Sequence, residues 1–174
     1  MTVADAATID FAKVKKEADR EGYKLGVDLC GAAEMGGTEY FVSTIASADG
    51  NLEALTSASA EVFNEAKTVG TLLFSAGVTK LVAVARVPED KCDAISAIEW
   101  VEAALKSYNG TVLPGATSQL ALGEVAAPEG EFPIKMKDVA LKSGLDFLRA
   151  KGKLQDDSGS EDEMIFGDDD IGNF

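Results

Sequence analysis

The sequence contains no histidine among its 174 residues. This absence excludes Ser-His and Cys-His catalysis and the histidine ligands of common zinc sites. Neither a phosphate loop ending in Gly-Lys-Ser/Thr nor a G-x-G-x-x-G motif occurs, so two familiar nucleotide-binding loops are absent as well. Carboxylates are numerous, but no spacing marks an acid/base pair. We therefore expect no catalytic residue, no metal site and no cofactor, and predict that the protein is not an enzyme.

Cysteine is also scarce. Cys30 and Cys92 are far apart and form no C-x-x-C pair, so we interpret them as reduced, packed thiols of an intracellular protein. No run reaches the roughly 18 apolar residues of a membrane span. Residues 1–10 contain no base, which argues against a signal or transit peptide. We expect a cytoplasmic protein that does not associate with membranes.

Charge is distributed unevenly near the C-terminus. The formal net charge is −14, and residues 156–174 carry eight acids and no base, so the rest of the chain carries −6. Just before this acidic tail, residues 133–153 hold six cations against only Asp138 and Asp146. Such a tail can repel polyanions, recruit basic partners or mask the cations. This layout favours a binding protein.

Hydrophobic periodicity and turn signals predict that helices alternate with strands. We expect helices over 8–22, 51–67, 93–107 and 134–151, and strands over 40–45, 71–75, 80–87 and 119–125. Asn51 is the expected N-cap of the second helix, and Gly77 marks a hairpin between the second and third strands. The glycine-rich residues 31–37 are interpreted as a connection. The fold class is α+β, with a mixed β-sheet that contains a hairpin and packs against several α-helices.

Several local motifs follow one another in a recognisable order. They are the strand pair Thr71-Leu-Leu-Phe-Ser75 and Lys80-Leu-Val-Ala-Val-Ala-Arg-Val-Pro88, the helix segment Ile95-Ser-Ala-Ile-Glu-Trp-Val101, then Asn109-Gly110, Ser118-Gln119 and Phe147-Leu-Arg149. In this order they resemble the C-terminal globular domain (C-Ala, DHH-associated) of eukaryotic alanyl-tRNA synthetases, here as a free-standing protein. The resemblance covers residues 51–153.

The resemblance implies a non-catalytic, RNA-associated module of the translation apparatus that binds tRNA or ribosomal RNA and can form a homodimer. The expected organisation is an N-terminal helix and glycine-rich connection (1–37), a synthetase-like α+β domain (38–155) and the acidic tail (156–174). The expected RNA contacts are the cations of the last helix, extended by those of the first: Lys135, Lys137, Lys142, Arg149, Lys13, Lys15 and Lys16. The other interpretation of these cations is the solvated face of an ordinary helix.

The tail combines acids with apolar anchors, which are Met164, Ile165, Phe166, Ile171 and Phe174. Its ending resembles, over a short stretch, the C-terminal peptides of ribosomal stalk proteins. The tail either docks onto a translation-associated protein, masks the basic helix, or only keeps the chain soluble. The alternative function is a protein-interaction adaptor that uses this tail and the sheet face without RNA.

Two single residues have two interpretations each. Trp100 is either a core residue, as most tryptophans are, or a platform for base stacking. Arg86 interrupts an apolar strand near its end, and is either a solvated strand-end side chain or a phosphate ligand.

Overall fold

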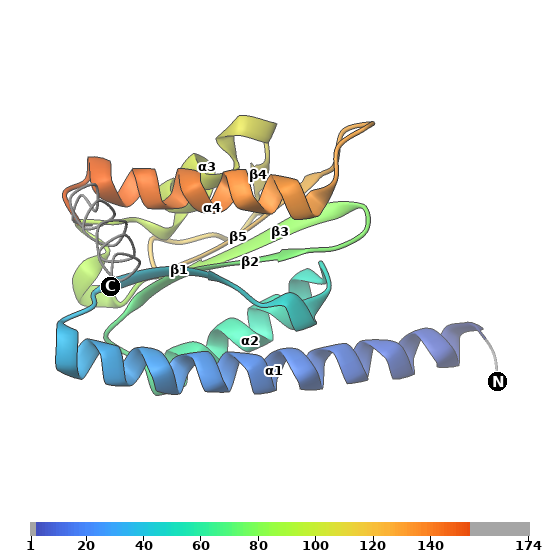
Figure 1. The fold of residues 1–174 in the computed structure, drawn as a ribbon, viewed down its shortest axis with the longest axis horizontal. Coiled ribbons are helices and arrows are strands. Elements are labelled where there is room, and N and C mark those ends of the chain that lie inside the picture. The colour runs from blue at the N-terminus through green and yellow to red at the C-terminus, as the bar shows by residue number, and fades with distance from the viewer. Residues whose placement is uncertain (1–2, 154–174) are drawn as a thin grey trace, which may run out of the picture.

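The computed structural model describes residues 3–153, with side chains described from residue 11 onward. Its elements form three layers, in which a β-sheet lies between two pairs of helices (Figure 1). The helices are α1 (Val3–Gly36), α2 (Leu52–Glu65), α3 (Ala97–Leu105) and α4 (Pro133–Ala150). The strands are β1 (Tyr40–Thr44), β2 (Gly70–Ala76), β3 (Lys80–Arg86), β4 (Thr111–Val112) and β5 (Leu120–Ala126).

The sheet has the order β1-β2-β3-β5-β4. β1 pairs with β2 in parallel, whereas β2–β3, β3–β5 and β4–β5 are antiparallel. The α+β class, the mixed sheet and the β2–β3 hairpin are therefore confirmed. β2 and β3 are apolar at nearly every position because both of their faces are covered.

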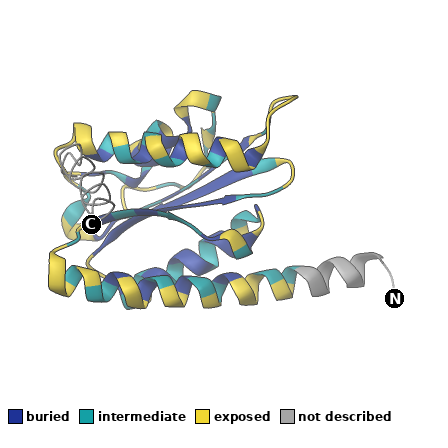
Figure 2. Ribbon diagram, viewed as in Figure 1, coloured by how far each residue is buried: buried dark blue, intermediate teal, exposed yellow. Residues whose placement is uncertain are grey.

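Alternate residues of these strands enter two separate cores. On one face, Leu72 and Phe74 pack with residues of α3 and α4, including Trp100. On the other face, Leu73 and Val84 pack with α1 and α2. Buried residues line the interior of each layer, while exposed residues follow the outer sides of α1 and α4 (Figure 2).

Trp100 is a core residue. Its ring is fully buried, and its Nε1 donates a hydrogen bond to the carbonyl oxygen of Gly144 in α4, at 3.1 Å. The ring also meets Tyr40 of β1 edge-on, with ring centroids 6.0 Å apart. These contacts join α3, α4 and the sheet, and they leave no exposed ring face for base stacking.

The first helix is longer than predicted. α1 continues past Gly22 to Gly36, so residues 31–36 are helical and not a connection. Gly22 is buried against α2, where an added Cβ would lie 2.5 Å from the carbonyl oxygen of Ala58. Gly22 therefore permits two helices to approach closely and does not end α1. The helix ends at Gly36, and the next residue, Gly37, has a φ of 71° that is readily adopted only by glycine.

The other predicted elements are present, with shifted ends. Asn51 caps α2, since its side chain accepts a hydrogen bond from the backbone nitrogen of Ala54 at 2.9 Å. The third helix begins at Ala97, later than expected, because a 3-10 turn at Glu89–Lys91 precedes it. The two-residue strand β4 was not predicted, since two residues are too few to show a period.

Candidate nucleic-acid interface

The predicted cations lie on opposite sides of the molecule. α4 covers one face of the sheet and α1 lies in the layer on the other face (Figure 1). Lys13, Lys15 and Lys16 therefore do not extend the surface formed by the cations of α4, contrary to the sequence-based interpretation. The structure offers two separate cationic helix faces, which differ in how their charges are compensated.

On α4, basic and acidic side chains alternate along the exposed face. Lys135, Lys142 and Arg149 recur every seven residues, and Asp138 and Asp146 lie between them. We call this set of five residues the α4 stripe. The stripe faces solvent because the opposite side of α4 packs against the protein, where residues 133, 136, 140, 144 and 148 are buried.

Two of the three cations in the α4 stripe are compensated by one acid. Lys142 Nζ lies 3.3 Å from Asp146 Oδ2, and Arg149 Nη1 lies 3.1 Å from Asp146 Oδ1. Lys137, the fourth predicted residue of this helix, is half-buried and lies off the stripe. Bases still exceed acids in this segment, because exposed Lys151 and Lys153 follow the stripe, but Lys142 and Arg149 are held by Asp146 and are less available to a phosphate.

On α1, four exposed cations follow one face of the helix. Lys13, Lys16, Arg20 and Lys24 are spaced three or four residues apart, and we call them the α1 stripe. Within residues 11–153, none of the four takes part in an ion pair.

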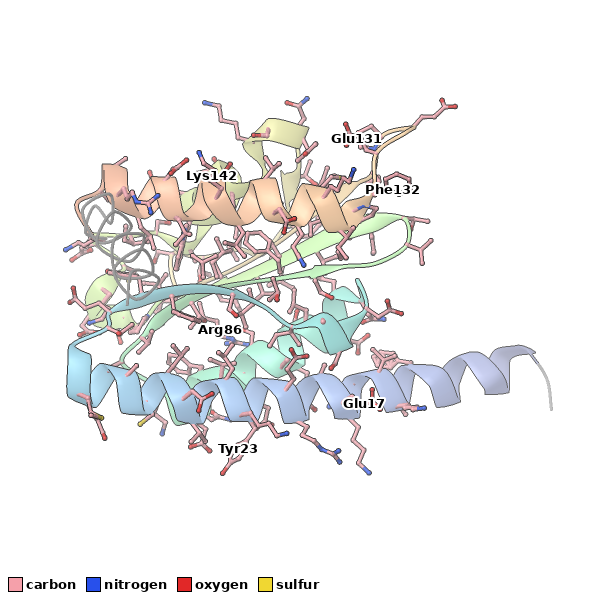
Figure 3. All side chains as sticks on the ribbon, in the orientation of Figure 1. Glu17, Tyr23, Arg86, Glu131, Phe132 and Lys142 are labelled. Carbon is pink, nitrogen blue, oxygen red and sulfur yellow. The ribbon has the colours of Figure 1, made fainter. Side chains whose placement is uncertain are left out.

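Three side chains near the α1 stripe do not belong to it: an aromatic ring, an acid and a lysine that forms an ion pair. Tyr23 lies beside the stripe, is 50% exposed and points away from the sheet (Figure 3). Glu17 is an exposed acid next to the stripe, and Lys15 lies off it, paired with Asp19 at 2.9 Å. Glu17 and Glu21 line the same shallow hollow as Arg20 and Lys24, although neither acid forms an ion pair with them. The stripe therefore has cations without ion pairs and an aromatic ring within reach.

Sequence reasoning missed Arg20, Tyr23 and Lys24 as parts of an interface. The signal was present, because residues 13, 16, 20 and 24 recur with the helical period. The pattern was overlooked because the first helix was predicted to end at Gly22, which placed Lys24 outside the helix that carries the other three cations.

Arg86 is not a solvated strand end. It is half-buried on the sheet face that α2 covers, and its Nε donates a hydrogen bond to Ser59 Oγ at 2.9 Å. Burial lowers the pKa of the Arg86 guanidinium, because the charged form loses hydration.

Three other expectations concern metals, membrane spans and the tail. Among the side chains of residues 11–153, no group of three or more cysteines and carboxylates is arranged to hold a metal ion. None of the helices described within residues 3–153 is long and apolar enough to cross a membrane. The tail anchors Met164, Ile165, Phe166, Ile171 and Phe174 lie outside the described residues, so docking through them stays a prediction.

Among known proteins, the chain matches only solved structures. No protein-family model matches the chain, and no curated protein is similar to it. Among solved structures, thirteen chains match. One is the C-Ala domain of alanyl-tRNA synthetase from Aquifex aeolicus, with a TM-score of 0.43, 19% sequence identity, and coverage of 61% of this chain and 88% of that chain. This neighbour is a C-Ala domain, the domain type that the resemblance named, and the eukaryotic and free-standing parts of that expectation stay predictions. A likeness at this level supports no inference about function.

Proposed function

We propose that this protein is a non-catalytic, RNA-associated module of the translation apparatus, which binds structured RNA, tRNA or ribosomal RNA, through the α1 stripe. The observation that carries the proposal is the run of four exposed cations without ion pairs in the described residues, in a chain whose net charge is −14. Since a helix rises about 1.5 Å per residue, the stripe spans about 16 Å. This length suits contact with several phosphates of one RNA backbone.

The binding mechanism is phosphate contact and shape recognition, and no bond is made or broken. Lysine and arginine displace counterions from the RNA, which makes affinity fall as salt rises. Tyr23 is placed to stack on an unpaired base beside the backbone. The α4 stripe is the weaker of the two surfaces, because Asp146 competes with RNA phosphates for Lys142 and Arg149. The translation context comes from the sequence resemblance alone.

In this proposal the acidic tail competes with RNA for the cations of the binding surface. Residues 156–174 carry eight acids, so they are attracted to the same cations as an RNA backbone. A full chain in which Asp168, Asp169 and Asp170 are replaced by Asn should bind RNA more tightly at low salt than the unaltered chain. Equal affinities would show that these three carboxylates do not mask the binding surface.

The experiment that tests the proposed interface compares two matched variants of the full chain. One changes the α1 stripe (K13Q, K16Q, R20Q, K24Q), and the other changes the four predicted residues of α4 (K135Q, K137Q, K142Q, R149Q). Each variant removes four positive charges, so both have the same net charge. Fluorescence anisotropy with tRNA at about 50 mM salt should show at least a tenfold loss for the α1 variant and a much smaller loss for the α4 variant.

Three outcomes would contradict this assignment. Loss of binding in the α4 variant alone would restore the sequence-based choice of surface. Equal losses would show that overall charge, not one helix face, determines affinity. Unchanged binding in both variants would mean that neither stripe contacts RNA. Far-UV circular dichroism of both variants checks that the helices are intact.

A second candidate function is an RNA-independent adaptor. It is favoured by three exposed apolar side chains at one end of the molecule, Val78 in the β2–β3 turn and Phe132 and Ile134 at the start of α4, which are 89%, 62% and 62% exposed. Ala127 N donates a hydrogen bond to Thr79 O at 2.9 Å, so the chain leaves β5 beside the β2–β3 turn. The start of α4 lies at this same end of the molecule (Figure 1). Most of the sheet face is covered by helices, so the adaptor would use this apolar end together with the tail.

A pull-down separates the two functions. If the adaptor is correct, nuclease treatment leaves the captured partners unchanged, and V78S/F132S/I134S or removal of residues 156–174 loses them. If the RNA module is correct, nuclease treatment releases the partners. Sedimentation at several protein concentrations tests the predicted homodimer in the same samples.

A further inference from the structure

Arg86 lies at the wall of a cleft that neither RNA stripe uses. It is the last residue of β3, the central strand, and it shares the sheet face of Val82 and Val84. The cleft has a volume of about 350 Å³ and is lined by Phe63, Arg86, Val87, Thr117, Gln119 and Leu120. Figure 3 shows Arg86 between the sheet and the α1–α2 layer. The cleft therefore opens beside α2, away from the outer faces of α1 and α4.

The charge of Arg86 has no counter-ion in the described part of the chain. Its hydrogen-bond partner, Ser59 Oγ, is neutral, and no carboxylate of residues 11–153 forms an ion pair with it. The lining of the cleft contains no acid either. Partial burial of a positive charge without an acidic partner is unfavourable, as the lowered pKa of this guanidinium also indicates.

A second polar group lies beside Arg86 in the same sheet row. Thr71 of β2 is directly opposite Arg86 in the antiparallel register, so the two side chains emerge on the same face. Thr71 is 1% exposed, and its Oγ1 has no hydrogen-bond partner among the described residues. With Ser59, these residues form a polar cluster inside an otherwise apolar interface. Their packing alone gives no reason for such a cluster.

We propose that the Arg86 cleft binds the phosphate group of a ligand. The hydrogen bond from Nε to Ser59 holds the guanidinium in place and leaves its two terminal nitrogens without a protein acceptor in the described residues. A guanidinium fork of this kind binds two oxygens of one oxyanion side by side.

The other walls of the cleft distinguish a phosphate from a carboxylate. The side chain of Gln119 is exposed in the cleft, and its amide can donate a hydrogen bond to a third oxygen, which a carboxylate does not have. The Thr117 hydroxyl is held within its own turn by Gln119 N, Leu120 N and Leu120 O. Phe63 and Leu120 form an apolar wall beside them, so the cleft also has room for an organic part of the ligand. The phosphate can belong to a free compound or to a nucleotide, and the experiment below separates these sources.

The experiment follows the arginine side-chain Nε–H signals of the ¹⁵N-labelled full chain by NMR. The sequence has three arginines, Arg20, Arg86 and Arg149, so three signals are expected, and Arg86→Met identifies one of them by its loss. Inorganic phosphate, AMP and acetate are added separately at constant ionic strength. We expect phosphate to move the Arg86 signal saturably while the other two move little. Arg149→Met is the matched control, and it should leave the Arg86 response unchanged.

The arms of this experiment give distinct outcomes. Saturation by AMP at lower concentration than by phosphate identifies a nucleotide-type ligand that uses the apolar wall, and equal saturation identifies the phosphate group alone. Equal movement of all three signals, or none at Arg86, would overturn the proposal. Acetate binding as tightly as phosphate would overturn it too.

A separate variant tests whether the chain's own tail occupies the cleft. If replacing Asp168, Asp169 and Asp170 by Asn moves the Arg86 signal in the absence of any added anion, a tail carboxylate is the occupant and the proposal fails. Thermal unfolding gives an independent check. Phosphate should raise the midpoint of the wild-type chain more than that of Arg86→Met, because general salt effects act on both proteins alike.

Discussion

The close contact between α1 and α2 predicts opposite effects for the same substitution at two positions of one helix. Gly22 and Gly31 both lie within α1, and replacing either by alanine removes a residue that disfavours helix. An added Cβ at Gly31 would meet nothing within 4 Å. At Gly22 it would lie 2.5 Å from the carbonyl oxygen and 3.1 Å from the Cα of Ala58. These are backbone atoms, so no side-chain rotation relieves the clash.

The magnitudes follow from this difference. Gly31→Ala should stabilise the protein by about 0.5–1 kcal/mol, the helix-propensity gain alone. Gly22→Ala has the same gain but forces α1 away from α2, and such overpacking costs about 1–3 kcal/mol. The propensity term cancels between the two variants. Their unfolding free energies should therefore differ by about 1–3 kcal/mol, with Gly31→Ala the more stable.

Urea unfolding followed by circular dichroism measures both variants against the wild type. For a chain of this size, each kcal/mol also shifts the thermal midpoint by about 2–4 °C. If Gly22→Ala stabilises the protein as much as Gly31→Ala, the close approach of the two helices is wrong. In that case the side of α1 that faces solvent, and with it the α1 stripe, would need to be assigned again.

Three further perturbations test other parts of the structure. Asp146→Asn frees two cations of the α4 stripe, so tRNA affinity at low salt should rise a few-fold in anisotropy measurements, and no rise would show that α4 stays off the RNA. Trp100→Phe removes the buried hydrogen bond to Gly144 and some packing, and should lower the unfolding free energy by about 1–3 kcal/mol in urea; a loss below about 0.5 kcal/mol would contradict the role of this contact. Burial and, after it, the charge of Glu39 raise the pKa of Tyr40 above its ordinary value of 10.0. The folded state therefore keeps the phenol proton longer, and this contribution is constant below pH 10 and is lost as pH rises toward the folded pKa. Tyr40→Phe should show a smaller alkaline decline in stability, and superimposable pH curves would refute this.

The sheet could be predicted from the sequence because its signals are local. The apolar run from Leu81 to Val87, the turn at Gly77 and the N-cap at Asn51 each specify structure within a few residues. The parallel pairing of β1 with β2 needs the intervening helix α2, which the sequence also indicated. By contrast, the true length of α1 depends on a contact that is distant in sequence. Glycine ends some helices and allows close packing in others, and only the position of α2 distinguishes the two roles of Gly22.

The candidate site was predicted only in part, for two physical reasons. Counting charges over residues 133–153 ignored the three- and four-residue spacing that pairs Lys142 and Arg149 with Asp146. This pairing could have been predicted from helical geometry. The burial of Arg86 could also have been predicted, since strand alternation places it with Val82 and Val84. The cleft around it could not, because Phe63 and Gln119 come from segments that only the folded chain brings together.

The salt dependence of tRNA binding tests the central claim most directly. If the four cations of the α1 stripe each contact a phosphate, log K of the full chain should fall against log salt with a slope of about −3 to −4, and affinity should drop about 100-fold between 50 and 200 mM salt. The K13Q/K16Q/R20Q/K24Q variant should show a much shallower slope, set by the weaker α4 stripe alone. A wild-type slope near zero, or the same steep slope in the variant, would contradict RNA binding through α1.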